Sequence, residues 1–446
     1  MVVMAIRVGM VSLGCPKNQV DAEIMLKTIE KEGYQLVGDT GNCDVVVVNT
    51  CGFIQSAKEE AIENIIEFIN LKNEGRIKSI VVTGCLAERY RSEILKEMPE
   101  IDAVVGIGSN QSICDVIAST LMGKQVERYG AKEDLNICGE RVLTTLPYYA
   151  YLKIAEGCDN CCSYCAIPQI RGRFRSRPME EIIEEAKWLA TQGVKELILV
   201  AQDTTRYGQD LYGSYSLAKL LKELCKIEDL IWIRTLYCYP DKITDELLEV
   251  IQSEEKLVKY IDMPLQHCND TVLKAMNRPM GKQETVKLID HIRKKVPGIT
   301  LRTTLIAGFP GETEEQFAEL MDFVKEVRFD RLGCFAYSEE EGTHAAQMTP
   351  QVPEEIRERR AEMIMEEQTT IMMQQNEQQI GKKIQVILEG VDKLAECYFG
   401  RSAADAPEID GKIFFTSEQK QHVMGDFVTV IINDVCDYDL VGEELL

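Results

Sequence analysis

The chain has 446 residues, 45% of them hydrophobic and 28% charged, with a formal net charge of −23. This length exceeds what a single hydrophobic core usually supports, so we expect two or three domains. No segment reaches the roughly 18–20 uninterrupted apolar residues that span a bilayer, which argues against membrane insertion. Nucleic-acid binding depends on Lys and Arg that neutralise phosphates, so the acidic balance argues against nucleic acid as substrate. It favours a basic protein partner, although the same charge would also serve solubility alone.

The N-terminal run MVVMAIRVGMVSLGC is apolar and ends in Gly-Cys, as a lipoprotein signal does. Its only basic residue, Arg7, lies inside the run, and Ser12 stands where such a signal has Leu. We therefore expect a buried first strand and a cytoplasmic protein. Thiols stay reduced in the cytosol, so the sixteen cysteines should include metal or catalytic thiolates rather than disulfides.

Residues 1–140 alternate β-branched runs with amphipathic helical patterns, which is typical of a doubly wound parallel sheet. Helices are expected from Asp21, after Ser56 and after Glu88. Ser56 and Glu59 also form the pattern of a helix-capping box. The expected strands are Ile6–Ser12, Val45–Asn49, Ser79–Thr83 and Ala103–Val105.

Residues 144–345 repeat a strand–helix unit about six times, which predicts an open, partial (β/α)6 barrel. One helix begins at Thr313, which forms a capping box with Gln316. A long polar helix follows over Pro353–Ile380. Other helices are expected after Pro178, Ser216, Thr244, Asp270 and Gln283. The expected strands are Tyr149–Ala155, Glu196–Ala201, Ile231–Leu236, Tyr260–Met263, Leu301–Ala307 and Arg331–Tyr337.

After Gly381, short runs separated by Gly, Asp and Pro predict a small antiparallel barrel. Its expected strands are Lys383–Leu388, Cys397–Gly400, Lys412–Phe415 and Phe427–Ile432. We place the three domains at residues 1–140, 144–376 and 377–446, with the long helix trailing the second domain.

The strongest chemical signal is the segment CDNCCSYC, which starts at Cys158 and ends at Cys165. Three thiolates in so short a segment can bind three irons of a cubane cluster. A zinc site would need a fourth ligand at suitable spacing, and neither a second C-x-x-C nor a nearby His follows. The middle ligand is left open, because C-x3-C-x2-C uses Cys162 whereas C-x2-C-x3-C uses Cys161.

C-x3-C-x2-C with Tyr164 before the last Cys resembles the radical S-adenosylmethionine signature. The resemblance favours Cys162 as the middle ligand and implies that a fourth iron is left open for the methionyl moiety of S-adenosylmethionine. The position of the motif agrees, because it follows the first barrel strand, and catalytic loops gather at the C-terminal ends of barrel strands.

A second set of cysteines is dispersed along the first domain. Cys15 lies in SLGCPKN, Cys51 in VNTCGF and Cys85 in VTGCLA, and each follows an expected parallel strand. Parallel strands bring their C-terminal ends to one edge of a sheet, where ligands normally bind. Three unrelated structural cysteines would need a coincidence of position, so these residues are expected to form a second metal site.

These motifs and the small barrel together resemble the methylthiotransferase family over nearly the whole chain. Matching segments are SLGCPKN, EGCDNCCSYCAIP, AQDTTRYG, MPLQH, GFPGET and DAPEIDG. The family combines a three-cysteine domain, a radical core and a TRAM barrel. Within it, the AQDTT and PLQH segments are closest to the members that modify an aspartate of a ribosomal protein, rather than to their tRNA-modifying siblings.

The resemblance implies two [4Fe-4S] clusters, held by Cys15, Cys51 and Cys85 and by Cys158, Cys162 and Cys165, with S-adenosylmethionine as cosubstrate. The implied reaction adds a methylthio group to the β-carbon of an aspartate of small-subunit ribosomal protein twelve, free or in the ribosomal subunit. The alternatives are a tRNA adenosine methylthiotransferase and a non-catalytic iron–sulfur carrier. The sequence identifies neither the electron donor nor the sulfur donor.

Further residues at strand ends are weaker candidates for contact with S-adenosylmethionine. Gln202 and Asp203 end the second barrel strand, His267 follows the fourth, and Gly308 ends the fifth. His267 and Gly308 could equally be structural. The arginines of RGRFRSR, which are Arg171, Arg173, Arg175 and Arg177, could balance the charge of a cluster or of the methionyl carboxylate, or form a solvated turn.

The segment DAPEIDG, which contains Asp405, Glu408 and Asp410, is expected to be an acidic loop of the small barrel. Such a loop would attract a Lys- and Arg-rich ribosomal protein. It could also be a solvated loop without a partner.

Overall fold

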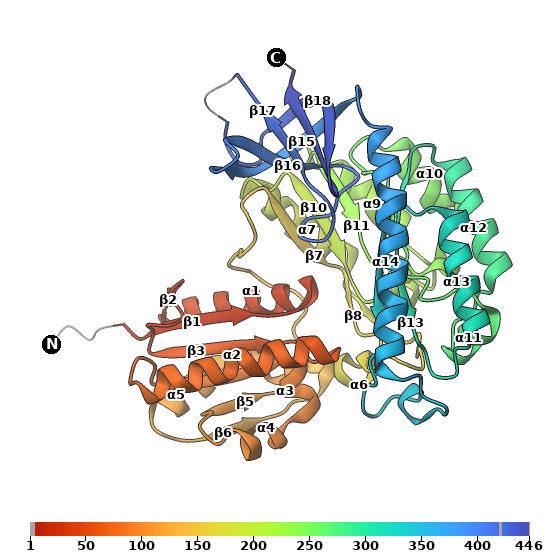
Figure 1. Cartoon of the computed structure of the whole chain (residues 1–446). Helices are drawn as coiled ribbons and strands as arrows, with labels where there is room; N and C mark the ends of the chain where they lie inside the picture. The colour runs from red at the N-terminus through yellow and green to blue at the C-terminus, as the bar shows by residue number, and fades with distance from the viewer. Residues whose placement is uncertain (1–4, 419–421, 446) are drawn as a thin grey trace.

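The computed structural model describes residues 5–418 and 422–445. Residues 1–4 of the apolar N-terminal run lie outside the described part. Figure 1 shows an N-terminal sheet domain on one side, a larger core with helices on its outer face, and a small barrel at the far end of the core. Among the described residues, no helix has the length and apolar character needed to cross a membrane.

The N-terminal domain is a six-stranded sheet in the order β2-β1-β3-β4-β5-β6, and all its pairs are parallel. The order reverses between β1 and β3, which confirms the doubly wound sheet and puts its switch point at these two strands. Its strands are β1 (Arg7–Ser12), β2 (Gln35–Val37), β3 (Val45–Thr50), β4 (Ser79–Gly84), β5 (Ala103–Val105) and β6 (Val126–Arg128). Its helices are α1 (Pro16–Lys31), α2 (Gln55–Asn73), α3 (Cys85–Tyr90), α4 (Ser92–Glu97) and α5 (Ile113–Leu121).

Several local predictions for this domain are wrong. Helix α2 begins one residue before Ser56 with Ile54 as its N-cap and no side-chain cap, so the predicted capping box does not form. The helix expected after Glu88 is two short helices, which are separated at Arg91 by a left-handed backbone conformation with φ of 47°. The short edge strands β2 and β6 were not predicted, because QLV and VER mix polar with apolar residues, unlike the wholly apolar AVV of β5.

The core contains six parallel strands in two sheets, β11-β10-β7 and β12-β13-β14. This is the open, partial barrel expected from six units. Its strands are β7 (Tyr149–Lys153), β10 (Glu196–Val200), β11 (Trp232–Thr235), β12 (Tyr260–Asp262), β13 (Thr300–Ala307) and β14 (Arg331–Ala336), with a two-stranded extension of β8 (Ala155–Glu156) and β9 (Arg175–Ser176).

Helices cover the outer face of these strands, and the long helix α14 runs along the open side (Figure 1). They are α6 (Ile167–Arg171), α7 (Met179–Thr191), α8 (Gln209–Tyr212), α9 (Leu217–Cys225), α10 (Asp245–Ser253), α11 (Asp270–Ala275), α12 (Lys282–Lys295), α13 (Glu314–Val327) and α14 (Glu354–Glu377). The capping box of Thr313 and Gln316 is confirmed at the start of α13. Pro353 is the N-cap of α14.

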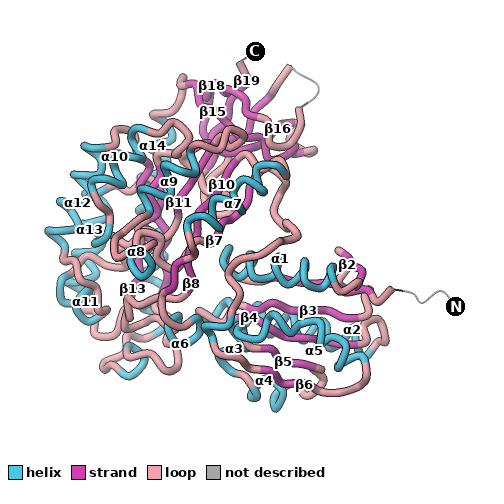
Figure 2. Tube along the Cα trace, turned by 180° about the vertical axis from the view of Figure 1, so that it is seen from behind, coloured by secondary structure: helices cyan, strands magenta, loops and turns pink. Residues whose placement is uncertain are grey.

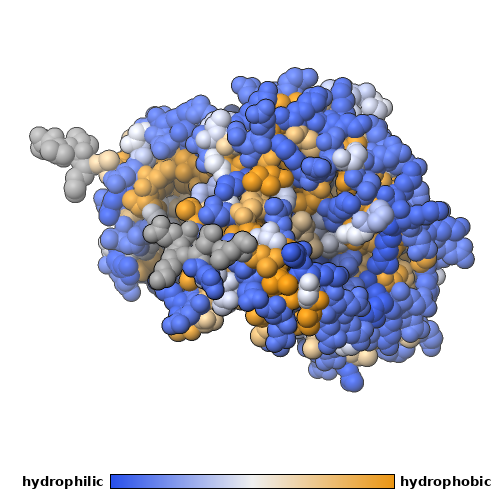
Figure 3. Space-filling view, turned by 90° about the horizontal axis from the view of Figure 1, so that it is seen from above, coloured by the Kyte–Doolittle hydropathy of each residue, from blue (hydrophilic) through white to orange (hydrophobic). Residues whose placement is uncertain are grey.

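The C-terminal domain is a closed barrel in the order β15-β16-β17-β19-β18. Its strands are β15 (Lys383–Asp392), β16 (Cys397–Ser402), β17 (Ile413–Thr416), β18 (Phe427–Cys436) and β19 (Asp439–Glu444). The pairing is antiparallel as expected, except that β17 and β19 are parallel. Seen from this end, the molecular surface is mainly hydrophilic with separate hydrophobic areas (Figure 3).

One buried apolar cluster contains side chains of all three domains. Val20 and Ile24 belong to α1, Tyr151 and Ile198 to the core sheet, and Ile387 to the small barrel. Figure 2 shows why, because α1 lies between the N-terminal sheet and β7. The three domains therefore share packing that fixes their mutual orientation.

The acidic segment DAPEIDG does not form the free docking loop expected from its charge. Asp405 is buried and pairs with Arg331 of β14 at 2.5 Å. Asp410 accepts a hydrogen bond from the Tyr260 hydroxyl at 2.7 Å. These two carboxylates attach the small barrel to the core, because buried charges must be paired within the protein. Of the three carboxylates in this segment, that of Glu408 is the exposed one.

Candidate metal centres and cofactor site

The cysteines of the first domain lie at the switch point of its sheet. Cys15 is the N-cap of α1, Cys51 follows β3, and Cys85 is the first residue of α3 after β4. Burial raises the pKa of Cys51 to about 12, and the nearby thiols of Cys85 and Cys15 add to this shift. Burial likewise raises the pKa of Cys85. The topology therefore brings together the three cysteines that the strand ends predicted.

Glycines let these loops approach one another closely. Gly14 has φ of +88°, and a Cβ atom there would lie 2.5 Å from the Cβ atom of Cys51. Gly84 has φ of +93°, and its Cβ would lie 2.4 Å from the carbonyl oxygen of Thr50. Both positions require glycine for conformation as well as for space. In the SLGC and VTGC segments, the glycine therefore allows the backbone conformation that places the following cysteine.

The second set of cysteines occupies the loop between β8 and α6. The amide of Cys158 donates to the carbonyl of Gly172 at 3.1 Å, and the amide of Asn160 points at the Cys158 thiol at 3.5 Å. Burial raises the pKa of Cys158 to about 11 and that of Cys165 still further, and Cys162 contributes to both shifts. These three thiols therefore lie near one another.

The two candidates for the middle ligand differ in their surroundings. Cys161 is exposed and has a left-handed backbone with φ of 50°. The Sγ atom of Cys162 lies 3.6 Å from the Tyr239 hydroxyl and 4.0 Å from Nη1 of Arg278. The thiol of Cys162 thus faces a hydroxyl and a cation inside the core, whereas that of Cys161 faces solvent.

Neither set has the arrangement of a single-ion site. In the described ranges, no group of three His, Cys, Asp or Glu side chains is placed to hold one metal ion. Each set instead offers three thiols with cationic neighbours, a donor set suited to an iron–sulfur cluster.

A buried charge network connects the two sets. Arg171 places Nη2 3.2 Å from the Sγ atom of Cys85 and Nη1 3.2 Å from Glu156, and it also pairs with Asp21 at 2.5 Å. Lys153 pairs with the same two carboxylates. Two cations and two anions thus balance at the junction of the domains. Within RGRFRSR, Arg171 is buried beside a cysteine, as expected for a residue that balances charge at a cluster. Arg173 is exposed, as expected for a solvated turn.

The predicted contacts of S-adenosylmethionine lie in two places. Gln202 donates to Glu156 at 2.7 Å, and its Oε1 atom is buried without a hydrogen-bond partner in the described part of the chain. Asp203 is fully buried and holds Asn160 at 2.9 Å and Lys242 at 3.3 Å. Both residues therefore border the cysteine loop.

His267 and Gly308 lie together at the ends of β12 and β13. The Nε2 atom of His267 lies 3.3 Å from a Glu312 oxygen, and the same oxygen accepts from the Gly308 amide at 3.0 Å. A Cβ atom on Gly308 would lie 2.4 Å from Cγ of Arg357 on α14. The space beside Gly308 is therefore used by helix packing, so the small residue serves a structural purpose there.

The sequence analysis missed several residues around these centres. Tyr237 and Tyr239 follow β11, and the ring of Tyr239 has Lys242 and Arg278 each at 4.0 Å from its centroid. Lys17, in the segment CPKN, lies over the Tyr237 ring at 3.3 Å. The sequence could have indicated Tyr237 and Tyr239 by their position after a core strand. It could have indicated Lys17 by its position two residues after Cys15.

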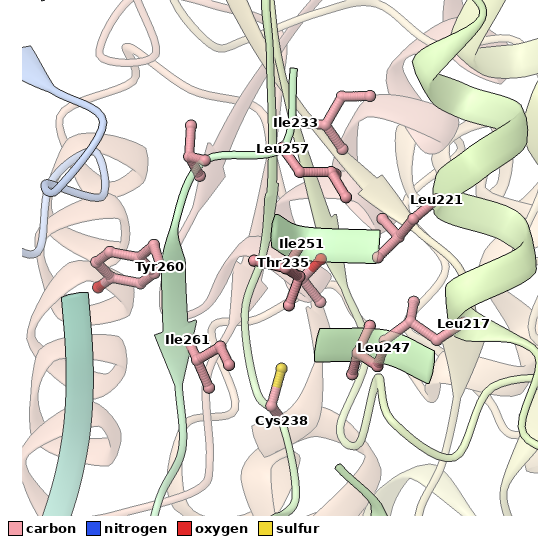
Figure 4. Close-up of a pocket in the computed structure, with 11 residues that line it drawn as sticks. Leu217, Leu221, Ile233, Thr235, Cys238, Leu247, Ile251, Leu257, Tyr260 and Ile261 are labelled. Atoms are coloured by element: carbon pink, nitrogen blue, oxygen red, sulfur yellow. The ribbon is translucent and has the colours of Figure 1, made fainter. Parts of the chain in front are cut away.

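Two cavities of the described structure are lined by none of the candidate cysteines. One cavity of about 10 Å³ lies among apolar side chains such as Leu221, Ile233 and Ile261, as Figure 4 shows, and this volume is at the lower limit for one water molecule. A second, of about 270 Å³, lies beside α1 and includes Asp21 in its wall. The first is packing space of the core.

The sequence matches known families in three blocks. These are the uncharacterized protein family UPF0004 over residues 7–106, the radical SAM superfamily over 152–324 and the TRAM domain over 380–444. The chain is 52% identical over 437 residues to the ribosomal protein uS12 methylthiotransferase RimO of Thermoanaerobacter sp. (strain X514), covering 98% of this chain and 99% of that protein. The chain belongs to this methylthiotransferase family. It is a radical S-adenosylmethionine enzyme, and S-adenosylmethionine and iron–sulfur are its cofactors.

Other relatives and solved structures agree. The RimO protein of Desulforamulus reducens is 50% identical over 441 residues, covering 98% of this chain and 99% of that protein. The radical S-adenosylmethionine methyltransferase TsrM of Kitasatospora setae has a TM-score of 0.57 at 14% identity, covering 75% of this chain and 74% of that one. At this identity the similarity to TsrM shows the fold alone.

Proposed function

We propose that this methylthiotransferase adds a methylthio group to the β-carbon of an aspartate of ribosomal protein uS12, the small-subunit protein twelve. The relatives that cover the whole chain at about half identity carry that name. The contact between Arg171 and Cys85 carries the proposal in the structure, because it joins the second cysteine set to the radical core. Ribosomal proteins are modified where ribosomes are made, so we propose a cytoplasmic location.

We further propose two four-iron clusters. Cys158, Cys162 and Cys165 would hold the first, and Cys15, Cys51 and Cys85 the second. A reduced cluster that binds S-adenosylmethionine supplies a radical able to take hydrogen from a carbon without an acidic proton, such as an aspartate β-carbon. Around the first set, Arg278 and Tyr239 contact the Sγ atom of Cys162. The Oε1 atom of Gln202, which has no hydrogen-bond partner among the described residues, is available to a ligand beside the cysteine loop.

The second set has a separate cationic environment. Arg171 reaches Cys85 while its charge is balanced by Asp21 and Glu156. This arrangement keeps the thiol beside the radical core. It supports a role for this set in carrying or delivering sulfur, with the methyl group coming from a second S-adenosylmethionine.

The test is iron content and product analysis of variants reconstituted without oxygen. Changing Cys158, Cys162 and Cys165 together to Ala should leave about four of eight irons and abolish S-adenosylmethionine cleavage. The same change at Cys15, Cys51 and Cys85 should preserve cleavage but abolish sulfur insertion. Mass spectrometry of uS12 and of tRNA from a deletion strain then identifies the substrate. Loss of a methylthio group from tRNA instead of uS12 would overturn the proposal in favour of the tRNA alternative.

A further inference from the structure

Lys17 is a buried cation that forms no salt bridge with the residues that the structure describes. Its side chain is 8% exposed, and it lies on α1 two residues after Cys15. Its ammonium nitrogen lies 3.3 Å from the centroid of the Tyr237 ring. Within residues 5–418 and 422–445, Lys17 forms no salt bridge; its electrostatic neighbours are the Tyr237 side chain, the Cys15 thiol and, without contact, Glu156. A desolvated ammonium that has no carboxylate in contact is costly unless a ligand accepts from it.

The neighbouring carboxylates are already neutralised. Asp21 and Glu156 pair with Lys153 and Arg171, so that group of four has no net charge. Asp262, which accepts a hydrogen bond from the Tyr237 amide, pairs with Arg302 at 2.8 Å. The positive charge of Lys17 is therefore in excess at the junction of the first and second domains.

Lys17 of the first domain contacts a core segment that also reaches the other set of cysteines. Tyr237 belongs to the segment after β11, and the hydroxyl of Tyr239 in the same segment lies 3.6 Å from Cys162. Tyr237 has φ of 60°, a left-handed conformation that a tyrosine rarely adopts. Its ring is thereby held beneath a lysine of the other domain. The ammonium thus lies near Cys15, over a segment that follows a barrel strand at its C-terminal end, where substrates bind.

We propose that Lys17 binds the side-chain carboxylate of the aspartate that is modified. This inference rests on the proposed function and deepens it by naming a specificity-determining residue. The β-carbon is bonded directly to the carboxylate carbon, so a cation that holds the carboxylate also positions the reacting carbon. A neutral side chain in the same place would leave the ammonium unpaired, and buried polar groups left unpaired reject a substrate strongly.

The test combines a change in the enzyme with a change in the substrate. Binding of uS12, and of uS12 with the target aspartate changed to Asn, is measured with reconstituted holoenzyme in the absence of oxygen. The unchanged enzyme should bind the Asp form roughly ten- to a hundred-fold more tightly than the Asn form. Lys17→Met should bind both forms about equally, because the coupling between the two charges is lost.

Two further variants control the experiment. Lys17→Arg keeps the charge and should retain much of the discrimination. Lys31→Met makes the same chemical change at an exposed position of α1 and should behave like the unchanged enzyme. Iron is counted in every variant, because Lys17 could instead balance the charge of the cluster held by Cys15.

The outcomes separate the two proposals. Full Asp-over-Asn discrimination by Lys17→Met would overturn the role of Lys17 while leaving the substrate intact. Loss of iron from Lys17→Met but not from Lys31→Met would assign Lys17 to the cluster and also overturn it. Absence of uS12 binding by the unchanged enzyme would overturn the proposed function, and the role of Lys17 with it.

Discussion

The Nη2 atom of Arg171, at the end of α6 in the core, lies 3.2 Å from the Sγ atom of Cys85 in the N-terminal domain. The same guanidinium holds Asp21 and Glu156, so one side chain connects a cysteine of one domain to the charges of the other. The relative position of the two cysteine sets therefore depends on Arg171.

Changing Arg171 to Met should destabilise the chain by about 3–5 kcal/mol, because two buried carboxylates would share the single cation of Lys153. The matched control is Arg173→Met in the same run, whose side chain is 87% exposed and whose loss should change stability by less than about 0.5 kcal/mol. Urea unfolding gives the free energy, and iron content reports on the second cluster. Equal effects of the two changes would refute the structural role of Arg171.

The identity of the middle cysteine ligand, Cys161 or Cys162, gives a second prediction. Cys162→Ala should cost about four irons, since its thiol faces Tyr239 and Arg278. Cys161→Ala should keep them, because Cys161 is exposed. Iron analysis of the two reconstituted variants decides between the spacings, and the reverse pattern would assign Cys161 as the ligand.

The docking of the small barrel gives a third prediction. Asp405→Asn should lower the free energy of unfolding by about 3 kcal/mol, since Arg331 would be left without its buried carboxylate. Glu408→Gln in the same segment should have almost no effect, because Glu408 is exposed and an amide still accepts from the Tyr149 hydroxyl. Fluorescence of Trp232, which packs on Phe427 of the barrel, follows the unfolding. Similar stability of the two variants would restore the solvated-loop interpretation.

Glu196 makes the same interface sensitive to acid. Burial alone would raise the pKa of this carboxyl, but Arg401 of the barrel and Arg234 of the core hold it below its ordinary value. A group whose folded pKa is depressed stabilises the fold above its unfolded pKa, about 4.3 for Glu, and loses that contribution as the pH falls through the folded pKa.

Glu196→Gln should therefore reduce the stability at pH 7, and its difference from the unchanged chain should shrink below about pH 4. Iron-free protein is suited to this urea titration, because acid releases cluster iron. A difference that stayed constant from pH 7 to the acid limit would show that ionisation of Glu196 contributes nothing.

The sequence by itself determined which residues carry the chemistry. The cysteines that follow Ser12, Asn49 and Thr83 within two or three residues could be grouped because parallel strands end at one edge, and the runs of β-branched residues locate those ends. Local rules also worked where the interaction is local, as for Thr313 and Gln316. They failed at Ser56, where α2 begins one residue earlier than its pattern indicates.

Only the tertiary structure decided which charges are free. The carboxylates of Asp405 and Asp410 read as a docking loop in the sequence, yet they pair with core residues far away in the chain. Lys17 read as part of a motif, yet it is the cation left without a salt bridge between the domains, in the part of the chain that the structure describes. Periodicity indicates that a side chain is buried but not what it faces, because a partner 74 or 150 residues away leaves no mark on the local pattern.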